Sequence, residues 1–279
     1  MKKYSKELTI YEQKQCALNI LVYVAEFCEK NNINYILSDG TLIGAVRHNG
    51  FIPWDDDIDI SMLRSDYNKF IELWNRTEGG KYTLHCWENG NLPFAFAKVC
   101  DDNTICYEGE MKRPTTGIWI DIFPLDFVPS SENEIVSHFL KMKSLTSLFG
   151  LHNVIMHSNI AYKLIQKILN VLRCIKHSTF LNLYSLKKIQ KEVEKELLKY
   201  EIGEKITNYI VIQRCPEQRK YGFPVSCCTD YVYHKFEGYD FRIPRDYDTL
   251  LQSFYGDYMK LPPKEKQVCD HKIKAFYIN

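Results

Sequence analysis

The densest chemical signal in the sequence is the run Trp54-Asp55-Asp56-Asp57-Ile58-Asp59-Ile60. A strand alternates its side chains between two faces. The run therefore places Asp55, Asp57 and Asp59 on one face and two isoleucines on the other, where they can enter a core. Successive carboxylates on one face lie roughly 7 Å apart, close enough for two of them to hold one divalent cation or bridge a pair. Mg²⁺ prefers such oxygen ligands, whereas a solvated acidic turn seldom alternates with isoleucine.

A third carboxylate lies in another apolar strand, predicted over 118–122. Asp121 is flanked there by two isoleucines, and an acid is not expected in that setting without a partner. If this strand lies beside the strand predicted over 57–63, Asp121 completes the acidic cluster. The alternative is an acid at the frayed end of a strand. Asp126 follows in what the pattern indicates is a loop.

Gly40-Thr41 opens a predicted helix over 40–47, directly after a predicted strand over 33–37. The free backbone N–H groups of a helix N-terminus can bind a phosphate, and glycine allows it to approach closely. Arg47 and His48 end this helix, and arginine suits bidentate phosphate contacts. Residues of these types are more often structural, so the motif gains its value from the acidic run that follows.

Hydrophobic periodicity defines the remaining elements. It predicts helices over 8–30, 65–74 and 246–255, with Ser65 as the cap of the second. It predicts further strands over 82–87, 94–99 and 104–107, and a hairpin of 231–236 and 239–243 around Glu237-Gly238.

Residues 135–200 differ from the rest because they are predicted to be almost wholly helical. From 135 to 191 there is no Asp or Glu, and within this stretch residues 160–173 separate apolar from basic side chains. A basic amphipathic helix can lie on an anionic membrane surface. An ordinary helical subdomain with lysines in water explains the pattern equally well, and the sequence does not decide between the two.

Composition indicates a soluble globular protein with one large domain or a core with an insertion. The chain has 279 residues, 45% of them apolar and 25% charged, and a net charge of +1. Neither a signal peptide nor an apolar stretch long enough to span a bilayer is visible, so a cytoplasmic protein is expected. Balanced charge and the absence of a regular basic-aromatic pattern argue against nucleic-acid binding.

The ten cysteines are scattered, with no C-x-x-C pair. In an intracellular chain of this size, free buried thiols are the expectation. A zinc site could be drawn from Cys215, Cys227, Cys228, Cys269 and His271, but the spacing typical of zinc ligands is missing.

Gly40-Thr41, Asp57-x-Asp59 and Asp121 together resemble the nucleotidyltransferase superfold. The longer run from Ser38 to Ile60 resembles the signature of the LicD family, which also includes the fukutin-related proteins. Its departures are Asp39 and Ser61, which stand where small residues, often glycine, are usual.

Further segments extend the resemblance over 33–127 and 235–265. Lys98 stands where the family often has a basic residue before an Asn-Thr pair, and the segment from Ile120 to Asp126 is close to its second motif. Phe236-Glu237-Gly238 and the segment from Tyr255 to Pro263 resemble its C-terminal motifs. Residues 130–230 carry no recognised resemblance.

The resemblance implies an α+β fold in which helices flank a mixed β-sheet with a nucleotidyltransferase-like arrangement. We expect a catalytic core over 1–130, a helical subdomain over 131–205 that faces the membrane or the acceptor, and a C-terminal part over 206–279 that packs back on the core. The implied reaction moves a phospho-alcohol, most often phosphocholine from CDP-choline, to a sugar hydroxyl and releases CMP. The implied acceptors are precursors of teichoic acid, capsule or lipopolysaccharide, including lipid-linked oligosaccharides at the inner face of the membrane.

The resemblance and the residue pattern assign roles within the site. The carboxylates expected to hold Mg²⁺ or Mn²⁺ are Asp55, Asp57, Asp59 and Asp121, and those expected to act in catalysis are Asp57, Asp59 and Asp121. Asp121 either completes the metal site or accepts the proton of the attacking hydroxyl. Candidate substrate contacts are Gly40, Thr41, Arg47, His48 and Lys98. Two alternatives remain: transfer of a nucleotide from an NTP, and a catalytically silent binding module of the same fold.

Overall fold

The computed structural model describes residues 4–77, 80–89, 95–108, 116–129, 131–157, 186–203, 205–207, 222–269 and 273–278. The chain divides into two compact units. Unit 1 combines residues 1–125 with 222–279, and unit 2 comprises residues 126–221.

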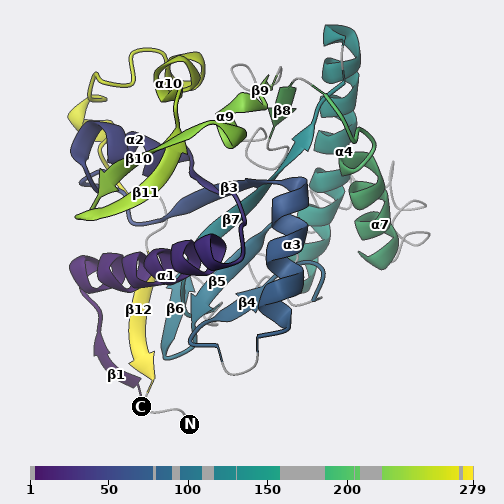
Figure 1. Ribbon diagram of the computed structural model, residues 1–279. Helices are drawn as coiled ribbons and strands as arrows, with labels where there is room; N and C mark the ends of the chain where they lie inside the picture. Colours follow the sequence, from purple (N-terminus) through teal and green to yellow (C-terminus); the bar gives the residue numbers. More distant parts are fainter. Residues whose placement is uncertain are drawn as a thin grey trace. The chain divides into compact units, whose positions relative to one another are not determined.

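Helices and strands are distributed over both units (Figure 1). The described helices are α1 (Ile10–Lys30), α2 (Asp39–His48), α3 (Arg64–Asn75), α4 (Glu132–His157), α7 (Leu186–Leu197), α9 (Ser226–Thr229) and α10 (Tyr247–Tyr255), with a 3₁₀ turn at Lys264–Lys266. The described strands are β1 (Tyr4–Glu7), β2 (Ile36–Leu37), β3 (Asp59–Leu63), β4 (Thr83–His85), β5 (Ala97–Asp101), β6 (Thr104–Glu108), β7 (Ile118–Phe127), β8 (Lys205–Thr207), β9 (Phe223–Pro224), β10 (Tyr231–Phe236), β11 (Tyr239–Pro244) and β12 (Ile273–Ile278).

A mixed sheet with the order β2-β3-β7-β5-β4 forms the centre of unit 1. β3 and β7 run parallel, whereas the other neighbours are antiparallel. α1 and α3 cover one face of this sheet (Figure 1). The fully buried residues of its strands include Ile60, Val99, Ile120 and Ile122. The α+β fold with a mixed sheet and flanking helices is therefore confirmed.

α1 is the longest helix of unit 1 and buries one apolar stripe. Thr9 caps it: its hydroxyl accepts from the Glu12 amide, and the Glu12 carboxylate accepts from the Thr9 amide. Such a capping box satisfies amide groups that a helix N-terminus leaves open. The stripe that α1 buries includes Ala17, Ile20, Leu21, Val24 and Cys28. The sequence periodicity predicted this helix from residue 8, and the cap sets its actual start at Ile10.

A second, three-stranded sheet joins the two ends of the described chain, in the order β1-β12-β6. β12 pairs antiparallel with both of its neighbours, so that Tyr4 lies opposite Ile278 and Cys106 lies opposite Ala275. The sequence patterns did not predict β1 or β12.

The hairpin of β10 and β11 was predicted correctly and is attached to the core through Arg242. The Arg242 guanidinium donates to Glu29 Oε2 at 2.6 Å and to the Ile33 carbonyl oxygen at 3.2 Å. Its charged carbon also lies 4.4 Å from the ring centroid of Tyr231. Arg242 is 6% exposed, and a buried guanidinium needs such partners. These contacts fix the hairpin against the C-terminal end of α1.

The turn of this hairpin docks on the loop that leads into the acidic run. The Glu237 carboxylate accepts from the Phe51 amide at 3.0 Å, and the Glu237 amide donates to the Asn49 carbonyl oxygen at 2.9 Å. A Cβ on Gly50 would lie 2.1 Å from Glu237 Oε1, so this contact requires glycine. Phe51 and Phe236 pack with ring centroids 5.0 Å apart. The C-terminal motif therefore holds the chain just before Trp54.

Unit 2 contains the pairing of α4 with α7 and that of β8 with the end of β7. The helical prediction for 135–200 agrees with α4 and α7. The amphipathic segment 160–173 lies outside the described residues. Among the described helices, none has the length and apolar character needed to cross a bilayer.

Three local predictions were wrong. The strand predicted from residue 57 begins at Asp59, because the register pairs of β3 with β7 begin with Asp59 and Asp121. Asp126 lies in β7 rather than in a loop, since it pairs with Thr207 of β8. Ser65 lies inside α3 and does not cap it, because the N-cap position is Leu63.

Candidate functional site

Four polar residues lie opposite one another on four adjacent strands of the central sheet. Asp59 of β3 pairs with Asp121 of β7, Asp121 pairs with Lys98 of β5, and Lys98 pairs with His85 of β4. Residues directly opposite in neighbouring strands project from the same face. The sheet register thus creates one polar row, Asp59–Asp121–Lys98–His85, and brings together three of the predicted site residues. His85 was not singled out from the sequence.

The predicted alternation in the acidic run is present in the structure. Asp55, Asp57 and Asp59 are partly exposed, whereas Ile58 and Ile60 are fully buried. The Asp121 amide donates to the Ile58 carbonyl oxygen at 2.9 Å, which continues the contact between the two chain segments beyond the first residue of β3.

Asp59 is surrounded by other carboxylates of this site. Burial raises the pKa of the Asp59 carboxyl group well above its usual range, and the charge of Asp57 raises it further. Three more carboxylates add to this effect: Asp39, Asp121 and Asp55. Neighbouring negative charges oppose the ionisation of a carboxyl group. The sequence-predicted carboxylates are therefore close enough to act on one another, and Asp39 joins them.

Asp121 is held by two neighbours on its own sheet. Lys98 Nζ lies 2.7 Å from Asp121 Oδ1, and the two side chains are 13% and 14% exposed. The indole nitrogen of Trp119 donates to Asp121 Oδ2 at 3.3 Å. The partner that an acid in an apolar strand requires is thus Lys98. Lys98 was predicted to bind substrate, and its ion pair in this structure is with Asp121.

The Gly-Thr turn supports the acidic loop from the other side. A Cβ on Gly40 would lie 2.5 Å from Asp55 Oδ2, so the carboxylate of Asp55 lies directly against the first turn of α2. Thr41 is 3% exposed, and its hydroxyl accepts from the Asp59 amide at 2.8 Å. Both residues were predicted to contact substrate. In the structure Thr41 positions Asp59, and Gly40 makes room for Asp55.

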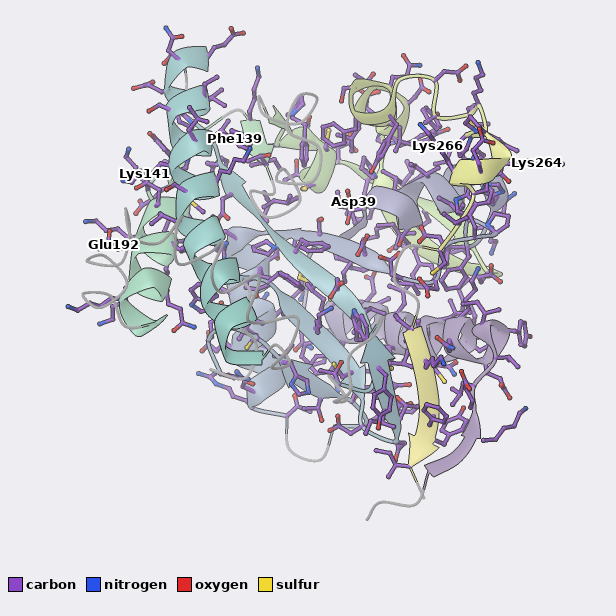
Figure 2. The ribbon with its side chains drawn as sticks, turned by 180° about the vertical axis from the view of Figure 1, so that it is seen from behind. Asp39, Phe139, Lys141, Glu192, Lys264 and Lys266 are labelled. Carbon is purple, nitrogen blue, oxygen red and sulfur yellow. The ribbon has the colours of Figure 1, made fainter. Side chains whose placement is uncertain are left out.

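Asp39 begins α2 and is labelled in Figure 2. Its φ of 50° lies in the left-handed region, where asparagine, aspartate and glycine are the residues most often found. The Tyr255 hydroxyl of α10 donates to Asp39 Oδ1 at 3.4 Å. In the sequence, Asp39 stands out only as a departure from the family pattern. Its contribution to the pKa of Asp59 makes it part of the acidic cluster.

Arg47 and His48 connect α2 to the C-terminal segment. Arg47 Nη1 donates to the Tyr258 carbonyl oxygen at 2.5 Å, and Arg47 Nε donates to His48 Nε2 at 2.9 Å. Burial lowers the pKa of both side chains, and the charge of Arg47 lowers that of His48 further. Both residues were predicted to bind substrate, which stays a prediction, and the contacts described here are with the protein itself.

At this oxygen-rich site, protein side chains would supply only part of the coordination shell of a hard cation. Within the described ranges, no three His, Cys, Asp or Glu side chains are arranged to hold a metal ion. Mg²⁺ commonly uses one or two carboxylates and completes its shell with water and substrate phosphates. Asp57 and Asp59 meet this smaller requirement, and the mutual repulsion around Asp59 is the electrostatic condition that a cation would relieve.

The cysteines do not contribute a metal site within the described part of the chain. The eight described cysteines are free, and Cys227 and Cys228 are buried whereas Cys269 is partly exposed. Burial raises the pKa of Cys228 well above its usual value and that of Cys227 to about 11, so both remain thiols at neutral pH. The other two residues of the zinc alternative, Cys215 and His271, lie outside the described residues.

Comparison with known proteins identifies relatives of this arrangement. Residues 32–149 match the family described as LicD/FKTN/FKRP, nucleotidyltransferase domain. The lipopolysaccharide cholinephosphotransferase LicD of Haemophilus influenzae is 33% identical over 275 residues, which cover 98% of this chain and 99% of the relative.

Two shorter matches cover parts of more distant relatives. Protein RP689 of Rickettsia prowazekii is 33% identical over 132 residues, 46% of each chain. The human ribitol 5-phosphate transferase FKRP is 34% identical over 71 residues, 23% of this chain and 14% of that protein. The near full-length match to the Haemophilus protein, together with the family match over the acidic site, shows that the chain belongs to the LicD family.

Proposed function

We propose that this protein is a phosphotransferase that moves phosphocholine from CDP-choline to a sugar hydroxyl of a cell-surface glycan precursor. The Haemophilus relative carries the name of a lipopolysaccharide cholinephosphotransferase and aligns over nearly the whole chain. The observation that carries the proposal is the crowding of carboxylates around Asp59, at the point where β3 and β7 run side by side.

The proposed cofactor is Mg²⁺, with Mn²⁺ as a substitute, held through Asp57 and Asp59. When bound, such an ion neutralises charge on the donor diphosphate and on the departing phosphate. Asp55 and Asp39 flank this pair and contribute to the raised pKa of Asp59. Thr41 and Gly40 keep Asp59 and Asp55 in place from the first turn of α2.

In the proposed reaction, the acceptor oxygen attacks the phosphorus that bears choline. The bond from this phosphorus to the oxygen that bridges the two phosphates breaks, and CMP leaves with that oxygen. The acceptor hydroxyl loses its proton as the new P–O bond forms. Asp121 lies next to Asp59 in the sheet, and we assign it as the group that accepts this proton.

The acceptor is proposed from chemistry shared within the family, namely a hydroxyl of a lipopolysaccharide, teichoic acid or capsule precursor. Such precursors are often built on lipid carriers, and contact with the inner face of a membrane would bring the enzyme to them. The basic segment that suggested this contact, 160–173, lies outside the described residues. Flotation with anionic liposomes tests the membrane part of the proposal, and an absence of binding at low salt would remove it.

Donor hydrolysis without acceptor tests the proposed function. The protein would be incubated with Mg²⁺ and a panel of CDP-choline, CDP-ribitol, CDP-glycerol and CTP, and CMP and diphosphate would be separated by chromatography. We expect CMP from CDP-choline, and we expect EDTA or the Asp59→Asn substitution to abolish it. Diphosphate from CTP would instead place the protein among nucleotidyltransferases. If no donor gave a product, either alone or with purified acceptor glycan, the chain would be a silent binding module.

A further inference from the structure

One lysine of α1 contacts the loop that leads into the acidic run. Lys14 Nζ donates to the carbonyl oxygens of Ile52 and Pro53, each at 3.3 Å. It also lies 5.0 Å from the centroid of the Phe51 ring, and cations are attracted to the faces of such rings. Three consecutive residues of the loop therefore contact one ammonium group. Because these partners carry no net charge, what the contacts fix is the position of the loop.

The Ile52 carbonyl oxygen links Lys14 to the carboxylates of the site. It accepts from the Asp55 amide at 3.0 Å as well as from Lys14. One oxygen thus joins the lysine to the turn that ends at Asp55. The Asp55 carboxylate lies against the first turn of α2, because a Cβ on Gly40 would be 2.5 Å from its Oδ2. Asp57 follows Asp55 after one residue, so the course of the chain through this turn determines where the proposed metal ligands lie.

The N-terminal part of α1 is a rigid support for this lysine. Thr9 and Glu12 form the capping box at the start of the helix. Gln13, the residue before Lys14, is 8% exposed, and its side chain donates to the Leu8 carbonyl oxygen at 3.0 Å. Functional sites are more precise when the residues that support them project from rigid elements. The backbone of Lys14 is therefore held in place before its ammonium group contacts the loop.

The β10–β11 hairpin holds the same loop through other atoms. The Phe51 amide donates to Glu237 Oε1 at 3.0 Å, and the rings of Phe51 and Phe236 pack with centroids 5.0 Å apart. Phe51 is thus in contact with the hairpin and with Lys14 of α1. Two elements that are far apart in the sequence fix the few residues that precede the acidic run, as groups that orient metal ligands commonly do.

We propose that Lys14 is a positioning residue for the metal site. Its ammonium group fixes the backbone of residues 51–53, so that the carboxylates of the acidic run face a divalent cation. In this role Lys14 acts through the loop and touches neither the cation nor the donor. The inference rests on the proposed function, because it concerns the cation that this function requires. The simpler alternative is a lysine stem that only covers apolar surface, whose loss would lower stability and leave the metal affinity of the folded protein unchanged.

The Mn²⁺ affinity of lysine variants tests the proposal. Full-length protein would be titrated with Mn²⁺ alone, and free Mn²⁺ would be followed by its electron paramagnetic resonance signal. Lys14→Met keeps most of the stem and removes the donors, and we expect it to bind Mn²⁺ at least about tenfold more weakly, the range for loss of a group that orients metal ligands. Lys14→Arg keeps donors and charge and should restore most of the affinity. Wild-type affinity in Lys14→Met, or equally weak binding in both variants, would overturn the inference.

Lys69 provides a matched control on α3. Its ammonium group donates to the Asn32 carbonyl oxygen at 3.0 Å, just after the opposite end of α1. Lys69→Met therefore removes the same kind of contact away from the acidic run and should bind Mn²⁺ as the wild type does. An equal loss of affinity in Lys69→Met would overturn the inference, because the effect would not be specific to Lys14.

Thermal unfolding in EDTA shows whether each titrated variant is folded. Should Lys14→Met not fold, Lys14→Gln takes its place, because its shorter amide cannot reach both carbonyl oxygens. The same weakening of Mn²⁺ binding is expected for it, and wild-type affinity would overturn the inference.

Donor hydrolysis by the same preparations separates this inference from the proposed function. CMP release from CDP-choline by the wild type, together with wild-type Mn²⁺ affinity in Lys14→Met, would overturn the inference and leave the function intact. Weaker Mn²⁺ binding in Lys14→Met, with no CMP release by the wild type even when acceptor glycan is present, would overturn the function and leave the inference standing.

Discussion

Asp59 in unit 1 and Glu196 in unit 2 are two shielded carboxylates with opposite surroundings. The neighbours that act on Asp59 are acids, and they raise its pKa together with burial. Burial alone would raise the pKa of Glu196 too, but Lys141, His138 and Lys199 together lower it. The first arrangement costs stability unless a cation is added, whereas the second supplies its own cations. The comparison sets a carboxylate that we propose binds a cation against one that joins two helices.

The contacts of Glu196 explain why it is structural. It is 5% exposed and accepts a hydrogen bond from Lys141, which projects from α4 (Figure 2). His138 Nε2 lies 3.3 Å from Glu196 Oε1 and 2.9 Å from the Glu196 carbonyl oxygen. These contacts join α4 to α7 inside unit 2, and nothing about them calls for an outside ligand.

The largest effect is expected for Asp59→Asn. Activity should fall by about 10³-fold, since loss of a main electrostatic contact in an active site commonly costs that much. Stability without metal should be equal to or higher than that of the wild type at pH 7, because the crowded charge is removed. CMP release and thermal unfolding in EDTA measure the two quantities. A variant that is both inactive and strongly destabilised would show that Asp59 is structural, as Glu196 is.

Wild-type stability without metal should also depend on pH in a definite direction. The folded-state pKa of Asp59 is raised, so the unfolded chain loses this proton first. The free energy of unfolding therefore decreases as pH rises from about 4 toward the raised value. Asp59→Asn should lack this part of the pH dependence in EDTA, which thermal unfolding between pH 4 and 8 can resolve.

Divalent metal should have the next largest effect. A ligand at one hundred times its Kd stabilises the folded state by about 2.7 kcal/mol. Mg²⁺ or Mn²⁺ at that excess should therefore raise the unfolding temperature of the wild type. Asp59→Asn should show no such rise, and Glu196→Gln should show the full one. An equal rise in all three proteins would mean that the metal acts elsewhere.

Glu196→Gln should destabilise the protein by about 2 kcal/mol, because a shielded carboxylate loses its charge opposite cationic partners. The folded-state pKa of Glu196 is lowered, so its stabilising effect is present above the usual pKa of glutamate and is lost as pH falls through the lowered value. The difference in the free energy of unfolding between Glu196→Gln and the wild type should therefore become smaller at acidic pH. Donor hydrolysis at 25 °C should be unchanged. A large loss of hydrolysis would show that unit 2 contributes to the chemistry.

Glu237 is a third kind of carboxylate, because it accepts a hydrogen bond from a backbone amide, that of Phe51. Glu237→Ala should lower stability by about 1 kcal/mol and weaken Mn²⁺ binding, since the Phe51 amide loses its acceptor just before the acidic run. Glu237→Gln keeps an acceptor oxygen at that position and should behave like the wild type. If Mn²⁺ binding is the same in both variants, the hairpin turn does not position the acidic loop.

Local patterns in the sequence were sufficient for much of this fold. Period-two alternation correctly separated Ile58 and Ile60 from the acids between them, and turn residues correctly located the hairpin at Glu237-Gly238. Both features depend only on neighbouring residues. The resemblance to a known family also supported the interpretation of the acidic run. That resemblance is confirmed by the comparison with the Haemophilus protein.

Features that depend on register between distant segments were not predictable. The contact of Lys98 with Asp121 requires β5 and β7 to pair at one particular offset. The contact of Arg47 with the Tyr258 carbonyl oxygen joins positions 211 apart in the chain, and no local pattern predicts it. Asp39 looked like a harmless departure from a pattern, because neither its left-handed backbone nor its distance from Asp59 can be read from neighbouring residues.

The pairing of β12 with both β1 and β6 has a consequence for how the chain is made. A ribosome releases β1 and β6 long before β12, and domains generally fold as units. During synthesis β1 and β6 therefore lack the strand that pairs with both of them, because β12 comes from the last described segment. Unpaired edges invite association with other chains, so nascent chains of this protein should need chaperone protection until residues 273–278 have left the ribosome.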